Sequence, residues 1–173
     1  MKEKFNQEII AYIDGANLDQ GVRGLGWLLD YKRFRIWLAD KYKVNKAYIF
    51  IGLIPKYTNL YKNLQEAGFL LVFKETVINK DGEVKGNCDA DLVLNTVVDY
   101  FEKKFHKAVI VSSDGDYASL VKFLNDKDAY KILISPSNKC SFLLRRLNLP
   151  ILYLDTQRSL LQKEKAPDRD KTL

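Results

Sequence analysis

Short apolar runs alternate with amphipathic stretches along most of the chain. The run IIAYI at residues 9–13 is continuous, rich in β-branched side chains and followed directly by Asp14, which predicts a buried strand of a parallel sheet. Apolar residues in 31–42 recur at helical spacing and predict an amphipathic helix. The same reasoning predicts strands at 47–53, 69–75, 108–113, 130–135 and 150–154, and helices at 59–68, 89–105, 116–126 and 140–147.

The order of these elements predicts an α/β fold. Strands that alternate with helices favour a three-layer α/β/α sandwich with a mainly parallel central sheet. The stretch 76–84 departs from this order, because it alternates around Asp81 and Gly82 and therefore predicts a hairpin. The length of 173 residues suits one domain, which we expect to span residues 1–158 and to be followed by a flexible polar tail at 159–173.

The charged residues hint at an anionic partner, and the rare residue types narrow the chemistry. The 28 lysines and arginines exceed the 22 aspartates and glutamates and give a net charge of +6, but the excess is spread along the chain. His106 is the one histidine, and the two cysteines, Cys88 and Cys140, form no CxxC pair. Structural zinc sites and paired-histidine metal sites therefore cannot be assembled from one chain.

The sequence shows no sign of a membrane or export segment. No apolar run approaches the roughly eighteen residues that a membrane-spanning helix needs, and the first residues, MKEKFNQE, are polar. Two cysteines at arbitrary spacing fit a reducing compartment better than a disulfide framework. We therefore expect a soluble, cytoplasmic protein without a membrane partner.

Aspartates follow the predicted strands at the ends where an open parallel sheet has its functional crevice. Asp14 comes directly after the first strand, and Asp114 and Asp116 follow a later one. Asp89 and Asp91 fall in the first turn of a predicted helix. If these ends converge, the carboxylates repel one another unless protons or divalent cations share them. Oxygen ligands without histidine favour Mg²⁺ or Mn²⁺, so the candidate metal ligands are Asp14, Asp89, Asp91, Asp114 and Asp116.

Such a site suits the hydrolysis of a phosphodiester bond. Metal ions can lower the pKa of a bound water, orient it in line and stabilise the leaving oxygen, and no histidine base is needed. Each aspartate alone also fits a structural role, because Asp-Gly after a strand is a common turn and an aspartate at a helix start is a common N-cap. The segment Asp114-Gly115-Asp116 holds more carboxylates than a turn requires, which favours a shared metal site.

Three segments carry most of these candidates: IDGANL (13–18), KGNCDADLVL (85–94) and VSSDGDYASLV (111–121). In this order and spacing, they resemble the motifs of the NYN domain, a branch of the PIN-like ribonuclease superfamily. The resemblance covers roughly residues 8–155. It implies a PIN-like fold, a metal-dependent nuclease, which is a hydrolase, and RNA as the substrate.

The resemblance also implies roles for single residues. It matches Asn17 to a polar residue that positions water or phosphate, and it makes Asp91 a secondary metal ligand. The acidic catalytic residues of the family match Asp14, Asp89, Asp114 and Asp116.

Two positions depart from the family pattern. Asn95 stands where many relatives carry a further acid, which weakens the case for a second metal ion more than for a first. Ser113 stands where many relatives have glycine, and its hydroxyl could ligate through water or fill the turn.

A nuclease needs cations and donors beside its acidic site, because phosphates contribute most of the affinity for nucleic acid. Each candidate for such a contact also fits a solvated surface. The candidates are Arg23, Lys85, Ser113, Ser137, Asn138 and Lys139, with Arg145 and Arg146 on the next helix. Aromatic residues that could stack on unpaired bases are Trp27, Tyr57 and Tyr117, although Trp27 and Tyr117 each fit a packed position equally well.

These observations support a metal-dependent ribonuclease first. The alternative is a catalytically weak or inactive NYN-type RNA-binding adaptor, and Asn95 is the feature that keeps it open. A phosphatase of small phosphate esters is a weaker hypothesis, because the chain lacks a DxDxT motif. The sequence does not separate RNA from single-stranded DNA, one metal ion from two, or a monomer from a homo-oligomer.

Overall fold

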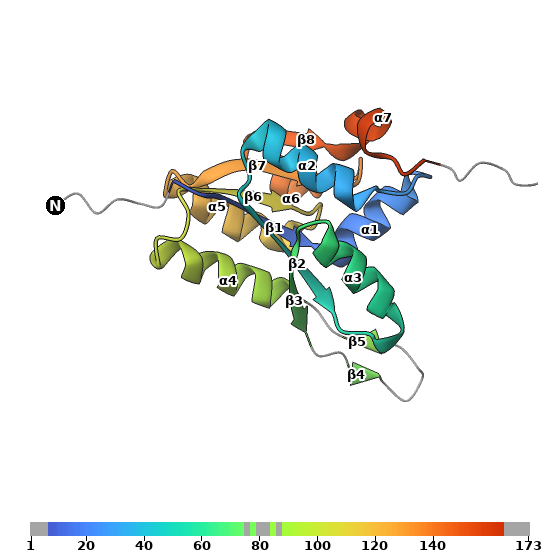
Figure 1. Ribbon diagram of the computed structural model, residues 1–173. Helices are drawn as coiled ribbons and strands as arrows, with labels where there is room; N and C mark the ends of the chain where they lie inside the picture. The colour runs from blue at the N-terminus through green and yellow to red at the C-terminus, as the bar shows by residue number, and fades with distance from the viewer. Residues whose placement is uncertain (1–6, 75–76, 79–83, 86–87, 165–173) are drawn as a thin grey trace, which may run out of the picture.

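The computed structural model describes residues 7–74, 77–78, 84–85 and 88–164 (Figure 1). Its centre is a six-stranded sheet in which every neighbouring pair of strands is parallel, in the order β3-β2-β1-β6-β7-β8. The predicted α/β class with a parallel central sheet is confirmed. The strands are β1 (Ile9–Asp14), β2 (Lys46–Gly52), β3 (Leu70–Lys74), β6 (Lys107–Val111), β7 (Tyr130–Ser135) and β8 (Ile151–Tyr153).

Helices cover both faces of the sheet and make three layers (Figure 1). The alternation of β1 sends Ala11 and Ile13 into one core and Ile10 and Tyr12 into the other. The first core is covered by α1 (Gly15–Gly24), α2 (Tyr31–Tyr42) and α3 (Thr58–Glu66). The second is covered by α4 (Asp89–Phe101), α5 (Ala118–Asp126) and α6 (Phe142–Arg145).

The strand order reverses between β1 and β6, and this places the functional edge of the sheet. The chain builds outward from β1 to β3, then returns to add β6, β7 and β8 on the other side of β1. In such sheets, ligands bind beyond the carboxyl ends of the strands at this switch point. Asp14 ends β1, and the segment 112–114 directly follows β6, so both lie at the switch point.

Helix α1 occupies a segment in which no helix was predicted. Its sequence GANLDQGVRG holds three glycines, which have low helix propensity. Asp14 compensates as the N-cap, because its Oδ1 accepts the Asn17 N–H at 3.0 Å. Leu18 and Val22 are buried against the sheet, so tertiary packing stabilises the helix.

Helix α4 ends earlier than the sequence predicted. It stops at Phe101, whereas the prediction ran to residue 105. Lys103 adopts φ 59°, in the left-handed region that does not continue a right-handed helix. The predicted hairpin is present as the antiparallel pair β4 (Val77–Ile78) and β5 (Val84–Lys85), while its turn at Asp81 and Gly82 lies outside the described residues.

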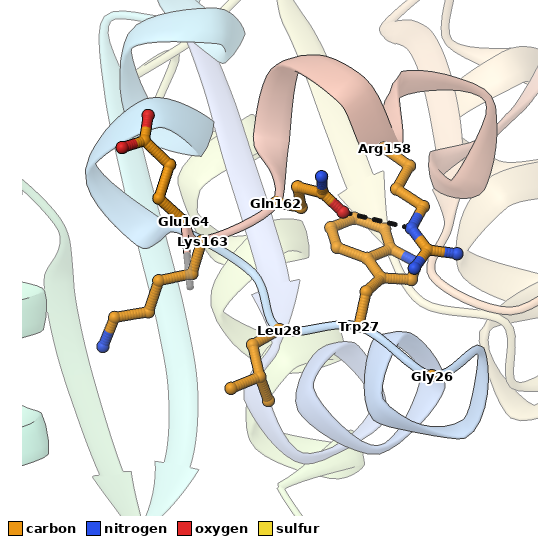
Figure 2. A pocket seen from close by; sticks show the side chains of 7 residues that line it. All are labelled: Gly26, Trp27, Leu28, Arg158, Gln162, Lys163 and Glu164. Carbon is orange, nitrogen blue, oxygen red and sulfur yellow. Dashed lines mark hydrogen bonds between the residues drawn. The ribbon is translucent and has the colours of Figure 1, made fainter. Parts of the chain in front are cut away.

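The C-terminal segment is ordered beyond the point where we expected a flexible tail. Helix α7 (Arg158–Leu161) follows the 3₁₀ turn η3 (Leu154–Gln157), and Leu161 is buried. The Lys163 N–H donates to the Leu28 carbonyl at 2.7 Å. Both residues line a hollow of about 710 Å³, which Figure 2 shows between the segment that follows α1 and the C-terminal segment. Residues 165–173 lie outside the described part of the chain.

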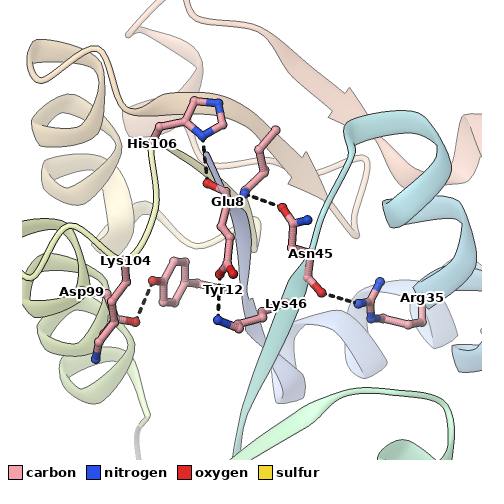
Figure 3. Close-up of polar contacts among 9 residues, drawn as sticks. Glu8, Tyr12, Arg35, Asn45, Lys46, Asp99, Lys104 and His106 are labelled. Atoms are coloured by element: carbon pink, nitrogen blue, oxygen red, sulfur yellow. Dashed lines mark hydrogen bonds and ion pairs between the residues drawn. The ribbon is translucent and has the colours of Figure 1, made fainter. Parts of the chain in front are cut away.

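Polar contacts tie the elements together at the amino-terminal edge of the sheet (Figure 3). His106 Nδ1 lies 2.9 Å from the Glu8 carbonyl oxygen. The one histidine therefore contacts the residue before β1 at this edge, opposite the edge where Asp14 and Asp114 lie. The buried hydroxyl of Tyr12 donates to Asp99 Oδ2 at 2.8 Å and joins β1 to α4. None of the helices in the described ranges is long and apolar enough to cross a membrane.

Candidate metal centre

Asp14 is the most enclosed carboxylate at the switch point. Asp14 is the last residue of β1 and is 7 % exposed. Oδ2 lies 3.3 Å from the Tyr117 hydroxyl and 3.5 Å from the Ser112 hydroxyl. Burial raises the pKa of this carboxyl, and the nearby Asp89 and Asp114 carboxylates raise it further, while the Asn17 N–H opposes the shift. The site therefore holds acidic groups that disfavour one another's charge.

Three further aspartates converge beside it. One carboxylate oxygen from each of Asp89, Asp114 and Asp116 lies within 4.8 Å of the other two. Asp89 opens α4, Asp114 is the N-cap of the 3₁₀ turn η2 (Gly115–Tyr117), and Asp116 lies within η2. Asp114 Oδ1 accepts the Asp116 N–H at 3.1 Å, which fixes the shape of that turn. The structure thus brings the last two motifs of the sequence to one place.

Tyr117 links the two groups of carboxylates. Its hydroxyl donates to Asp89 Oδ1 at 2.5 Å and also lies 3.3 Å from Asp14 Oδ2. The residue is fully buried, so of the two roles that the sequence left open for Tyr117, stacking on a base and packing in the core, the structure supports the core. Burial and the two carboxylates raise the pKa of this phenol, which keeps its proton on the oxygen. Sequence reasoning missed this contact, and the only signal for it was a tyrosine next to Asp116.

Asn17 has a fixed orientation. Its Oδ1 accepts both the backbone N–H and the hydroxyl of Ser113, each at 2.9 Å. Because a backbone N–H can only donate, the atom it meets must be the amide oxygen. The two N–H groups of the amide are then left to other partners. The Ser113 hydroxyl is used in holding Asn17, which gives this serine a structural task in the turn.

Asp14, Asp89 and Asp114 line a cavity of about 270 Å³ together with Asn17, Gln20 and Cys88, and Asp116 lies outside this lining. Two ligands of one Mg²⁺ ion lie at most about 4.2 Å apart, twice the Mg–O distance, so small side-chain movements would bring the Asp89, Asp114 and Asp116 oxygens onto one ion. Within the described ranges, no ion pair reaches Asp14, Asp114 or Asp116. An oxygen-only donor set with excess negative charge fits a hard divalent cation.

Asp91 does not join this group. Its Oδ2 lies 3.7 Å from Lys74 Nζ at the end of β3. Its carbonyl accepts the side-chain N–H of Asn95 at 2.8 Å. The side chain of Asn95 therefore donates a hydrogen bond within α4.

The predicted nucleic-acid contacts are spread over a wider area. Arg23 lies in the last turn of α1 and pairs with Asp19 at 2.8 Å. Ser137 and Lys139 follow β7, two strands from β1, and the Lys139 N–H donates to Ser137 Oγ at 3.0 Å. Asn138, between them, is exposed. None of these residues lines the carboxylate cavity, and the side chain of Lys85 lies outside the described residues.

The two remaining aromatic candidates separate clearly. Trp27 is 5 % exposed, and its indole N–H donates to Asp155 Oδ1 at 2.9 Å, so Trp27 belongs to the core. Tyr57 is 41 % exposed and stays available for stacking.

Comparison with known proteins agrees with this geometry. The family model of the NYN domain matches residues 8–146. A solved structure of a protein of unknown function from Vibrio parahaemolyticus has a similar fold, with a TM-score of 0.72 and 21 % identity over 93 % of this chain and 99 % of that one. No curated protein matches the chain. The match over most of the chain, with the acidic cluster at the switch point, shows that this protein belongs to the NYN domain family, a PIN-like family whose members are generally nucleases.

Proposed function

We propose that this protein is a metal-dependent ribonuclease that hydrolyses phosphodiester bonds of RNA with the help of Mg²⁺ or Mn²⁺. The observation that carries the proposal is the convergence of the Asp89, Asp114 and Asp116 carboxylates beside the buried Asp14. Ion pairs among the described residues do not account for the placement of Asp14, Asp114 and Asp116, because none of these ion pairs includes them. A divalent cation would balance their charge.

The aspartates of the cluster would hold the cation, with Asp14 completing the acidic wall. When bound, such an ion would neutralise charge on the phosphate and lower the pKa of a water molecule, so that hydroxide is available as the nucleophile at neutral pH. The chain itself contributes orientation. Asn17 keeps its amide N–H groups for a phosphate oxygen or a water in the cavity, because Ser113 holds its oxygen. Ser112 supports the turn by accepting the Asp114 N–H at 3.1 Å.

RNA is the proposed substrate because the three motifs resemble those of PIN-like ribonucleases. The net charge of +6 suits a polyanionic partner, and it includes the negative charge of the carboxylate cluster. With the four aspartates at the switch point, Asp14, Asp89, Asp114 and Asp116, set aside, the rest of the chain is more basic than the net charge suggests.

The test is cleavage of a fluorescent single-stranded RNA in Mg²⁺ or Mn²⁺. We expect activity with either ion, none in EDTA, and a loss of at least about a hundredfold in Asp14→Asn and Asp114→Asn. Asp126→Asn is the matched control, because Asp126 forms an exposed pair with Lys122 on α5 and should leave activity unchanged. Full activity in EDTA or in both site variants would contradict the proposal. RNA that binds in EDTA and stays intact in metal would point to the adaptor function.

A further inference from the structure

A second hollow opens directly beside the carboxylate cavity. It has a volume of about 600 Å³ and lies between α1 and α3. It shares four lining residues with the carboxylate cavity: Ala16, Gln20, Ile51 and Gly52. Because the two hollows share these residues they are neighbours, and a strand that crosses the carboxylates is within reach of this hollow. We call the second hollow the α1–α3 groove.

The walls of the α1–α3 groove are preformed. Ala16, Gln20 and Arg23 are spaced at i, i+4 and i+7 on α1 and give one wall. The opposite wall includes Ile54, whose backbone is held by hydrogen bonds to the buried Tyr61. The hydroxyl of Tyr61 accepts the Ile54 N–H at 2.8 Å and lies 3.0 Å from the Gly52 carbonyl oxygen. A ligand would therefore meet a shaped groove rather than a loop that must first be ordered.

The lining of the groove suits a flat, largely apolar ligand with a few polar atoms. Ile51, Ile54 and Leu60 supply apolar surface, and the Gln20 amide offers both a donor and an acceptor. Tyr57 also lines the groove and is 41 % exposed. Apolar walls with a few polar groups are typical of sites that bind small molecules or parts of them.

Positive charge lies next to the aromatic residue. Lys56 Nζ lies 5.0 Å from the centre of the Tyr57 ring. Arg23 also lines the groove, where its charge is paired with Asp19 at 2.8 Å. An aromatic ring beside a cation is a combination that proteins use for the bases and phosphates of unpaired strands. The acidic wall of the neighbouring cavity gives no comparable place for a base.

We propose that the α1–α3 groove receives an unpaired base of the strand whose phosphate lies at the carboxylates, with Tyr57 as its stacking surface and Gln20 as a hydrogen-bonding partner. The identity of the strand rests on the proposed function. A base held in a duplex cannot enter the groove without unpairing, so the ligand class is single-stranded nucleic acid.

The first test measures binding alone. The dissociation constant for a 12-nucleotide oligoadenylate is measured by fluorescence anisotropy in EDTA, which prevents metal-dependent cleavage. Tyr57→Ala should weaken binding about tenfold or more, and Tyr57→Phe should stay within about twofold of the wild type. Phe101→Ala is the matched control, because Phe101 is 66 % exposed at the far end of α4 and should not change the affinity. Wild-type affinity in Tyr57→Ala would overturn the proposal.

The second test removes the bases instead of the tyrosine. The wild type should prefer the oligoadenylate over a 12-nucleotide strand of abasic sugar phosphates. Tyr57→Ala should lose most of this preference, because both changes delete the same contact. An unchanged preference would overturn the proposal. Tyr57→Ala would also overturn the proposal if it changed the sedimentation coefficient of the protein and left its affinity for the oligoadenylate unchanged. That result would indicate that a second copy of the chain binds to this face.

These outcomes separate the groove from the nuclease activity. Base-dependent binding through Tyr57 without cleavage in metal would support the groove and contradict the proposed function. Cleavage by the wild type, with Tyr57→Ala equal to it in binding and base preference, would contradict the groove alone.

Discussion

The hydroxyl of Tyr117 lies 2.5 Å from Asp89 Oδ1 and joins the start of α4 to the turn after β6. The same hydroxyl lies 3.3 Å from Asp14 at the end of β1. Buried hydroxyls are costly without a partner, and the partners of this one are the two carboxylates. Tyr117 therefore positions side chains that come from different elements.

Removal of this hydroxyl should weaken metal binding. We expect Tyr117→Phe to keep the fold, because the ring still fills the core, and to raise the dissociation constant for Mn²⁺ by roughly 10–100-fold, as loss of an outer hydrogen bond to a metal ligand does elsewhere. Isothermal titration calorimetry measures the constant. Tyr12→Phe is a matched control, since Tyr12 is a fully buried tyrosine that donates to Asp99 at the other end of α4. Equal Mn²⁺ affinity in both variants would contradict a positioning role.

The metal-free protein should become more stable when Asp14 loses its charge. Asp14 is buried beside Asp89 and Asp114, so Asp14→Asn relieves repulsion while the new amide oxygen still accepts the Asn17 N–H. We expect a gain on the order of 1 kcal/mol, or about 2–4 °C in melting temperature, measured by calorimetry in EDTA. Asp19→Asn, at the exposed pair with Arg23, should change the melting temperature little. A marked loss of stability in Asp14→Asn would argue that the cluster is structural.

Position 15 has no room for a side chain, because the start of α1 packs closely against β2. A Cβ atom at this position would lie 2.9 Å from the Phe50 carbonyl oxygen and from Ile49 Cγ2. Gly15→Ala should therefore lower the free energy of unfolding by about 1–3 kcal/mol, because the start of α1 must move away from β2. Gly24→Ala has open space around it and should raise stability by about 0.5–1 kcal/mol. Urea denaturation of both variants checks the contrast, and equal effects would mean that the close approach does not matter.

Trp27 should matter for stability and not for nucleic acid. Trp27→Phe removes the hydrogen bond to Asp155 and should cost about 1 kcal/mol or more in the free energy of unfolding. Its affinity for the oligoadenylate should equal that of the wild type, since the indole is buried. A clear loss of affinity, with the fold intact by circular dichroism, would return Trp27 to the nucleic-acid site.

The sequence allowed the parallel sheet and the place of its aspartates to be predicted, because apolar runs that end in Asp are local signals. The run before Asp14 and the one before Asp114 both proved to be strands whose carboxyl ends meet. Helix α1 was missed because its glycines oppose a helix locally, whereas burial of Leu18 and capping by Asp14 stabilise it in the fold.

Contacts between segments far apart in the chain could not be predicted from the sequence, for a different reason. The pairing of Asp91 with Lys74 and the bond of Tyr117 to Asp89 join segments whose spacing is set only by the folded chain. Side-chain direction within a cluster depends on such contacts. The sequence could therefore keep Asp91 as a secondary ligand but could not exclude it from the group formed by the other motif aspartates.

The central claim is that the aspartates at the switch point form a cation site. The most direct measurement is the anomalous scattering of a crystal soaked in Mn²⁺. The account predicts a peak within coordination distance of Asp89 and Asp114, and its absence in a crystal of Asp114→Asn. A fully soaked wild-type crystal without a peak between these carboxylates would contradict the claim.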